Sequence, residues 1–154
     1  MLLQPGWLGG ILLRYLAIPE DAARAIRAGA GAVVLSNHGG HNCDSVCAPI
    51  DALPDVVAAV AGRAKVIVDS GVRRGSDILK ARALGAEAVM VGRAPLYGAA
   101  ASGQAGAARA LEILQCELNI TMAMTGCASI ADGSPSLLAG HSRTTSPILQ
   151  ESTI

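Results

Sequence analysis

Four short apolar runs alternate with Ala-rich helical patterns along the chain, and this alternation restricts the folds that it can adopt. The runs predict strands loosely around residues 11–16 and at 32–35, 66–68 and 88–91, and the patterns predict helices at about 19–28, 52–60, 76–84 and 104–124. Strands that are apolar on both faces and are each followed by a helix are typical of a parallel sheet with helical crossovers. Four such units suit either a small doubly wound sheet or half of a (β/α)8 barrel, which needs about 250 residues when complete.

Composition narrows the class of protein. The chain has 154 residues, and its 12 Lys and Arg balance its 12 Asp and Glu, so that the formal net charge is zero. This neutrality argues against a nucleic-acid binder, and the 2% aromatic residues offer few platforms for base stacking. A transmembrane helix would need about 18 consecutive apolar residues, which do not occur, and the stretch 8–18 lacks the basic region of a signal peptide.

The domain organisation follows from the same patterns. Residues 1–139 carry the alternating units and are expected to form one domain, whereas 140–154 lack any periodicity and are expected to be a disordered tail. The four cysteines are too sparse for a disulfide scaffold, which favours a reducing cytoplasmic location.

A polar block, Ser36-Asn37-His38-Gly39-Gly40, directly follows the second expected strand. Ligands of parallel α/β folds bind at the C-terminal ends of the strands. Histidine can act there as a general base, because its unperturbed pKa lies close to neutral pH. His38 is therefore the candidate base, although a loop histidine with a purely structural role fits the same position.

Two later loops combine glycine with arginine. Asp69-Ser70-Gly71-Val72-Arg73 follows the third expected strand, and Gly92-Arg93 follows the fourth. Backbone N–H groups at a helix start and the forked guanidinium of arginine are both suited to a phosphate. Without an anion, arginine is disfavoured at a helix N-terminus, because the helix dipole repels it. The two loops therefore predict a phosphate site, the alternative being arginines that only face solvent.

A metal site is the competing interpretation of the segment after His38. The residues with ligand chemistry there are His38, His41, Cys43, Asp44 and Cys47. A structural zinc site usually needs a closed set of four ligands. No second pair of cysteines or histidines completes a known arrangement, so we expect no metal.

Taken together, these blocks resemble the family of FMN-dependent 2-hydroxy acid oxidases and dehydrogenases, which includes glycolate oxidase and the lactate and mandelate dehydrogenases. The similar segments lie at 19–40, 50–60, 66–98 and 110–127, within roughly residues 12–138. The order SNHGG, DSGVRRG and VGR is far more specific than a single glycine motif. The resemblance implies a (β/α)8 TIM barrel, of which this chain is similar to the C-terminal half only, with about four parallel βα units.

The resemblance also implies roles for individual residues. His38 matches the active-site base, which takes the α-proton or the hydroxyl proton of the substrate. Ser36 matches a serine in contact with the flavin. The FMN ribityl and phosphate cradle corresponds to Asp69, Gly71, Arg73, Gly92 and Arg93.

Two departures from the family pattern stand out. A lysine near the flavin ring is replaced by Arg14, which keeps the charge but changes the size and shape of the cation. An arginine that grips the substrate carboxylate is replaced by His41, so that bidentate recognition of the carboxylate is lost. Arg14 is thus the expected cofactor contact, and His38 and His41 are the expected substrate contacts.

The expected function is the FMN-dependent oxidation of a small 2-hydroxy acid to the 2-oxo acid. The alternative is a non-catalytic half-barrel that binds FMN or phosphate or assembles with a partner. A phosphate-binding isomerase or synthase barrel is a third possibility, against which the SNHGG block argues. We expect assembly with a second copy or with a complementary N-terminal half, because a sheet of four strands cut from a barrel leaves both edges unpaired.

Overall fold

The computed structural model describes residues 11–14, 18–43 and 45–139. Its four parallel strands pair in the order β1-β2-β3-β4. Their bounds are β1 Ile11–Arg14, β2 Ala30–Leu35, β3 Lys65–Asp69 and β4 Ala88–Met90. A doubly wound sheet reverses its strand order at a switch point. The consecutive order therefore confirms the partial (β/α)8 barrel and excludes the doubly wound alternative.

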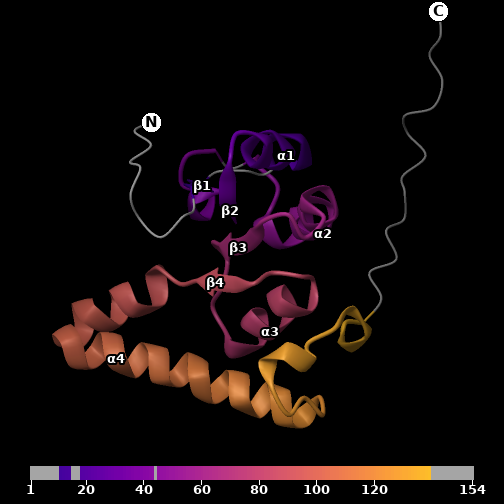
Figure 1. The fold of residues 1–154 in the computed structure, drawn as a ribbon. Coiled ribbons are helices and arrows are strands. Elements are labelled where there is room, and N and C mark those ends of the chain that lie inside the picture. Colours follow the sequence, from indigo (N-terminus) through magenta and orange to yellow (C-terminus); the bar gives the residue numbers. More distant parts are fainter. Residues whose placement is uncertain (1–10, 15–17, 44, 140–154) are drawn as a thin grey trace, which may run out of the picture.

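Each strand is followed by a helix. The helices are α1 Pro19–Arg27, α2 Pro49–Val60, α3 Gly75–Ala83 and α4 Arg93–Met124, and short 3-10 helices span His38–Gly40, Ile130–Asp132 and Pro135–Leu137. Figure 1 shows α1, α2 and α3 on one side of the sheet, with the longer part of α4 running back along α3. The arrangement places the loops after β2, β3 and β4 at the same end of the sheet.

Two helices begin earlier than the sequence patterns predict. Helix α2 begins at Pro49 rather than at residue 52, because proline is well suited to the first helical position, where its missing N–H costs nothing. Helix α4 begins at Arg93, directly after β4, and breaks at Ser102 and Gly103, whose φ is +57°. The expected start near residue 104 is thus the second half of a broken helix.

The core lies between the sheet and the helices. Val33 and Leu35 of β2 are opposite Val66 and Val68 of β3, and all four side chains are buried. Leu53 and Val56 of α2 belong to the same cluster. Fully burying such aliphatic side chains contributes about 1.5–3 kcal/mol each. These contacts therefore hold β2 and β3 in register, and with them the loops that follow the two strands.

Strand β4 differs from the expectation of a strand buried on both faces. Ala88 is exposed, and Met90 is 41% exposed. β4 lies at the edge of the sheet, and only its middle residue, Val89, packs against the core. The strand also ends at Met90, one residue before the predicted end. The first strand was expected to extend to residue 16, and residues 15–17 lie outside the described part, as does the expected tail at 140–154.

No helix within the described residues is both long enough and apolar enough to cross a membrane.

Candidate functional site at the C-terminal ends of the strands

A cavity of about 810 Å³ opens at the C-terminal ends of β2, β3 and β4. It is lined by His38, Gly39, Gly40, His41, Asp69, Ser70, Gly71, Val72, Arg73, Met90, Gly92, Arg93, Ala94 and Tyr97. Small-molecule sites typically have volumes of about 300–1,000 Å³. A second cavity of about 420 Å³ adjoins the first, and both are lined by Arg73 and Arg93. Seven of the nine site residues predicted from the sequence line the larger cavity, and an eighth, Ser36, hydrogen-bonds to Asp69, which lines it.

The block after β2 folds into a tight turn that presents His38. Asn37 Oδ1 accepts a hydrogen bond from the Gly39 N–H at 3.0 Å, and His38 itself has a φ of +57°. A left-handed backbone is uncommon for a residue with a side chain, and such strain is concentrated at functional sites. The turn leaves the His38 side chain exposed at the cavity.

A chain of hydroxyl groups links this turn to the loop after β3. Ser36, which is 3% exposed, donates from Oγ to Asp69 Oδ2 at 2.8 Å and accepts from the His38 N–H at 3.2 Å. Ser70 Oγ accepts from the Gly39 N–H at 2.9 Å. Because the Ser36 hydrogen is directed at Asp69, Ser70 is the donor across the 3.3 Å that separate the two hydroxyl oxygens. The chain therefore anchors the turn that carries His38 to the carboxylate of Asp69.

Ser70 holds its position at a conformational cost. Its φ is +84°, in the left-handed region that favours glycine. Gly71 follows with a φ of +80°, and a Cβ atom built there would meet no atom within 4 Å, so this glycine leaves room beside the cavity. In the loop after β3, the strained Ser70 contacts the turn that carries His38, and the next residue, Gly71, leaves the backbone open to a ligand.

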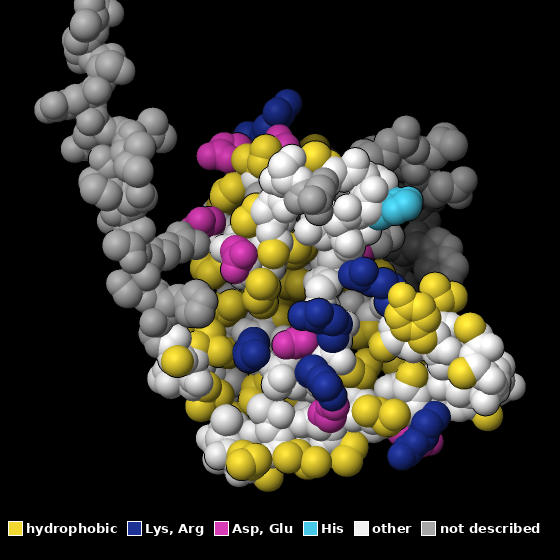
Figure 2. Space-filling view, turned by 180° about the vertical axis from the view of Figure 1, so that it is seen from behind, with side chains coloured by type: hydrophobic (Ala, Val, Ile, Leu, Met, Phe, Trp, Pro, Cys, Tyr) yellow, Lys and Arg dark blue, Asp and Glu magenta, His cyan; other side chains and the backbone are white. Residues whose placement is uncertain are grey.

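The two predicted arginines both reach the cavity. Arg93 is the first residue of α4, and its guanidinium lies 3.1 Å from the position that a Cβ on Gly39 would occupy. Arg73 lies at the end of the loop after β3. In the part of the chain that the structure describes, no ion pair involves either guanidinium. Figure 2 shows Lys and Arg side chains gathered across the middle of one face of the molecule. Both guanidinium groups are therefore available to an anion.

The described residues of the segment after the turn do not gather into a set of metal ligands. Among the described residues, no group of three or more His, Cys, Asp or Glu side chains comes together in a way that could hold a metal ion. Asp44 lies outside the described residues. Ser45 Oγ lies 3.4 Å from Cys43 Sγ, and this hydrogen bond lowers the pKa of the exposed thiol. His41 is exposed and lines the cavity, whereas Arg14 is described only as the last residue of β1, so that its contact with a cofactor stays a prediction.

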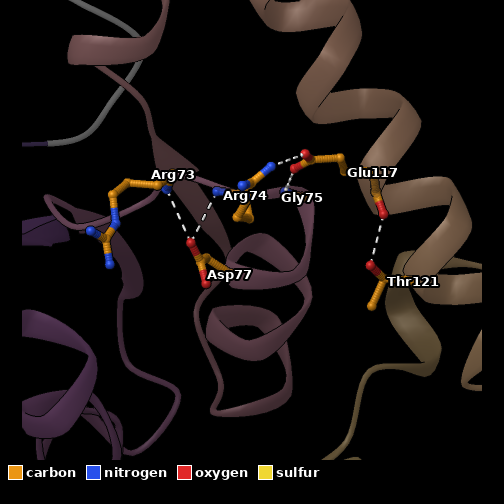
Figure 3. A network of polar contacts seen from close by, with 6 residues as sticks. All are labelled: Arg73, Arg74, Gly75, Asp77, Glu117 and Thr121. Atoms are coloured by element: carbon orange, nitrogen blue, oxygen red, sulfur yellow. Dashed lines mark hydrogen bonds and ion pairs between the residues drawn. The ribbon is translucent and has the colours of Figure 1, made fainter.

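Sequence reasoning missed the residues that brace the loop after β3. Asp77 Oδ2 accepts from the N–H groups of Arg73 and Arg74, each at 3.0 Å. An acid at the third position of a helix is a known cap signal, so Asp77 could have been found. Glu117 contacts Arg74 and Gly75 from α4 (Figure 3). No local pattern points to a partner so distant in the sequence.

The chain is similar to several characterised proteins. Residues 3–140 match the family of FMN-dependent dehydrogenases. An L-lactate oxidase from a Nostoc species is 49% identical over 128 residues, which are 83% of this chain and 35% of that protein. A pre-mycofactocin synthase from Mycobacterium tuberculosis is 49% identical over 129 residues, 84% of this chain and 33% of that protein.

Solved structures lead to the same family. A soluble mutant of the membrane-associated (S)-mandelate dehydrogenase from Pseudomonas putida superposes with a TM-score of 0.82 and 46% identity, covering 86% of this chain and 38% of that chain. The chain therefore spans about a third of the length of these relatives.

Proposed function

Because this chain belongs to the family of FMN-dependent dehydrogenases, we propose that it carries the phosphate site and the proton-transfer histidine of an enzyme that oxidises a small 2-hydroxy acid to the 2-oxo acid. One observation carries the proposal: His38, Arg73 and Arg93 come from three successive strand-to-helix loops and line the same cavity. Lactate and mandelate, which appear in the names of two relatives, are both 2-hydroxy acids. The name of the synthase relative contains no hydroxy acid. The proposal of a 2-hydroxy acid as substrate therefore depends on the residues around the cavity as well as on the names of the relatives.

The residues around the cavity fit FMN. Arg73 and Arg93 would bind its phosphate, together with the N–H groups at the start of α4, where the helix dipole favours an anion. No atom lies within 4 Å of a Cβ built on Gly71 or Gly92, so both glycines leave space for the cofactor. Ser36 and Asp69 would complete the cradle beneath the ribityl chain and the ring. FMN, when bound, supplies the acceptor for the two electrons of the oxidation.

His38 performs the proton chemistry in this proposal. It takes the α-proton or the hydroxyl proton of the hydroxy acid and so acts as the general base. The hydrogen bonds from the backbone of His38 and Gly39 to the hydroxyls of Ser36 and Ser70 hold the turn in place. His41 would contact the substrate carboxylate with a single imidazole, in place of the fork of an arginine. Arg14 would place a positive charge beside the flavin ring.

The non-catalytic half-barrel is the second candidate. It is favoured by the replacement of the carboxylate-gripping arginine by His41. In this case FMN or phosphate binds but no hydroxy acid is oxidised. Bleaching of the flavin absorbance by a 2-hydroxy acid separates the two candidates.

The remaining features of the proposal concern the whole protein. Residues 1–139 form one partial-barrel domain, supported by the packing of the helix Pro135–Leu137 against α3, and 140–154 form a tail. The open edge at β4 pairs with a second copy or with a complementary N-terminal half. The four free cysteines are in keeping with a cytoplasmic location.

The test measures the affinity for FMN and for riboflavin, which lacks the phosphate. Charged hydrogen bonds contribute about 1.5–3 kcal/mol each, so Arg93→Ala should weaken FMN binding about tenfold or more and leave riboflavin unchanged. Arg109→Ala is the matched control, because Arg109 is an exposed arginine on the same helix, paired with Glu112 at 3.1 Å. Unchanged FMN affinity in the Arg73→Ala/Arg93→Ala double variant would overturn the proposal.

A further inference from the structure

The two consecutive arginines after β3 have different surroundings. Arg73 lines both cavities, whereas the Arg74 guanidinium donates to Glu117 Oε1 at 2.8 Å. Figure 3 shows the two side chains leaving the backbone in opposite directions, with Arg74 directed at α4. The two arginines therefore differ in their electrostatic surroundings, because Arg74 is paired with a carboxylate from α4 whereas Arg73 faces the cavities.

Glu117 also contacts the backbone at the start of α3. Its second oxygen, Oε2, accepts from the Gly75 N–H at 2.9 Å. This N–H belongs to the first turn of α3, where no partner within the helix exists. The neighbouring N–H groups of Arg73 and Arg74 are bound by Asp77. Two carboxylates thus hold three successive backbone N–H groups, and the loop that carries Arg73 has little freedom to move.

Close packing of the two helices makes this contact possible. A Cβ atom on Gly75 would lie 2.6 Å from the carbonyl oxygen of Leu114, which is too close for any side chain. Glycine therefore lets the start of α3 touch the backbone of α4, and the carboxylate of Glu117 comes within reach. The Gly75 N–H and the Arg74 guanidinium lower the pKa of Glu117, which keeps the side chain ionised at neutral pH.

We propose that Glu117 is a positioning residue for the cofactor phosphate: through Arg74 and Gly75 it holds the loop 71–75 so that Arg73 faces the anion. This inference rests on the proposed function, since it needs a phosphate in the larger cavity. Glu117 does not touch the ligand. It makes the affinity for the phosphate depend also on the part of α4 that follows the break at Ser102 and Gly103.

The experiment compares Glu117→Gln with Glu112→Gln, because Glu112 is a carboxylate on the same helix that pairs only with Arg109 among the described residues. Glutamine keeps the size of the side chain and an acceptor for the Gly75 N–H, but loses the charge. One charge-assisted hydrogen bond is lost in the loop, so the Kd for FMN should rise about fivefold to tenfold in Glu117→Gln. Riboflavin affinity should stay unchanged, and Glu112→Gln should behave as the parent chain does.

A second variant and a second measurement separate positioning from folding. Arg74→Gln removes the partner of Glu117 and should weaken FMN similarly, and the Arg74→Gln/Glu117→Gln double variant should lose no more than either single variant. Amide hydrogen exchange over residues 71–76 should become faster in Glu117→Gln, with exchange over 36–42 unaltered. If the Kd for FMN is the same in both single variants as in the parent chain, this inference is overturned and the proposed function stays intact. A parent chain that does not distinguish FMN from riboflavin overturns the proposed function, and this inference with it.

Discussion

Replacing Ser70 separates two effects that the structure places on one residue. The left-handed backbone, with a φ of +84°, costs a residue with a side chain about 1–2 kcal/mol. The hydroxyl offsets this cost, because it accepts from the Gly39 N–H at 2.9 Å and lies 3.3 Å from Ser36 Oγ. Each hydrogen bond contributes about 1 kcal/mol net. Ser70→Ala keeps the strain and loses both hydrogen bonds, whereas Ser70→Gly loses the bonds and relieves the strain.

The expected order of stability follows from these magnitudes. The Gly39 N–H keeps its bond to Asn37 Oδ1 at 3.0 Å in both variants, so that no buried donor is left without a partner. Ser70→Ala should lower the free energy of unfolding by about 1–2 kcal/mol. Ser70→Gly should be about 1 kcal/mol more stable than Ser70→Ala, which corresponds to about 2–4 °C in Tm.

Urea unfolding with an unchanged m-value measures the difference. Ala58→Gly is the control, because Ala58 is an exposed residue of α2 with ordinary helical geometry, and glycine there should destabilise by about 0.5–1 kcal/mol relative to alanine. The sign of the glycine effect should therefore be opposite at the two positions. An alanine variant at least as stable as the glycine variant at position 70 would refute the reasoning.

Four further predictions concern the site and its surroundings. His38→Ala should slow flavin reduction by a 2-hydroxy acid about 10²–10⁴-fold and leave FMN affinity intact; reduction at the parent rate, followed by absorbance, would remove His38 from the mechanism. His41→Arg with Arg14→Lys should raise the rate of hydroxy acid oxidation when a complementary N-terminal half is supplied, and no gain would show that these departures are not limiting. The pKa of Glu117 is lowered from 4.5, so the ionised side chain contributes stability above pH 4.5 that is lost as the pH falls through the lower pKa of the folded state. The difference in unfolding free energy between the parent chain and Glu117→Gln should therefore shrink below pH 4.5. A difference that stays constant with pH would contradict this. Sedimentation at low micromolar concentration should show dimers or larger species, because β4 lies at the edge of the sheet and Met90 of β4 and Leu96 and Tyr97 of α4 are exposed. A stable monomer of 15.5 kDa with one sharp unfolding transition would contradict the predicted assembly.

The sequence by itself determined the order of strands and helices and the loops that carry the site. These features depend on local chemistry: apolar runs form the strands, and Pro19 marks the start of α1. Because the C-terminal ends of parallel strands meet at one edge of a sheet, the positions of His38, Arg73 and Arg93 after successive strands were enough to predict that they lie around one cavity.

Only the tertiary structure decided which of these residues face the cavity and what holds them there. Arg73 and Arg74 are neighbours with the same side chain, and the family resemblance alone singled out Arg73. No sequence pattern predicts that Arg74 is bound by Glu117, which is 43 residues away from it. The hydrogen bond from Gly39 to Ser70 spans 31 residues and accompanies a strained backbone that no composition signal predicts. Such contacts depend on how two loops or two helices approach each other. That approach is set by the packing of Gly75 against α4 and by the burial of the core, and neither has a signature within a short stretch of sequence.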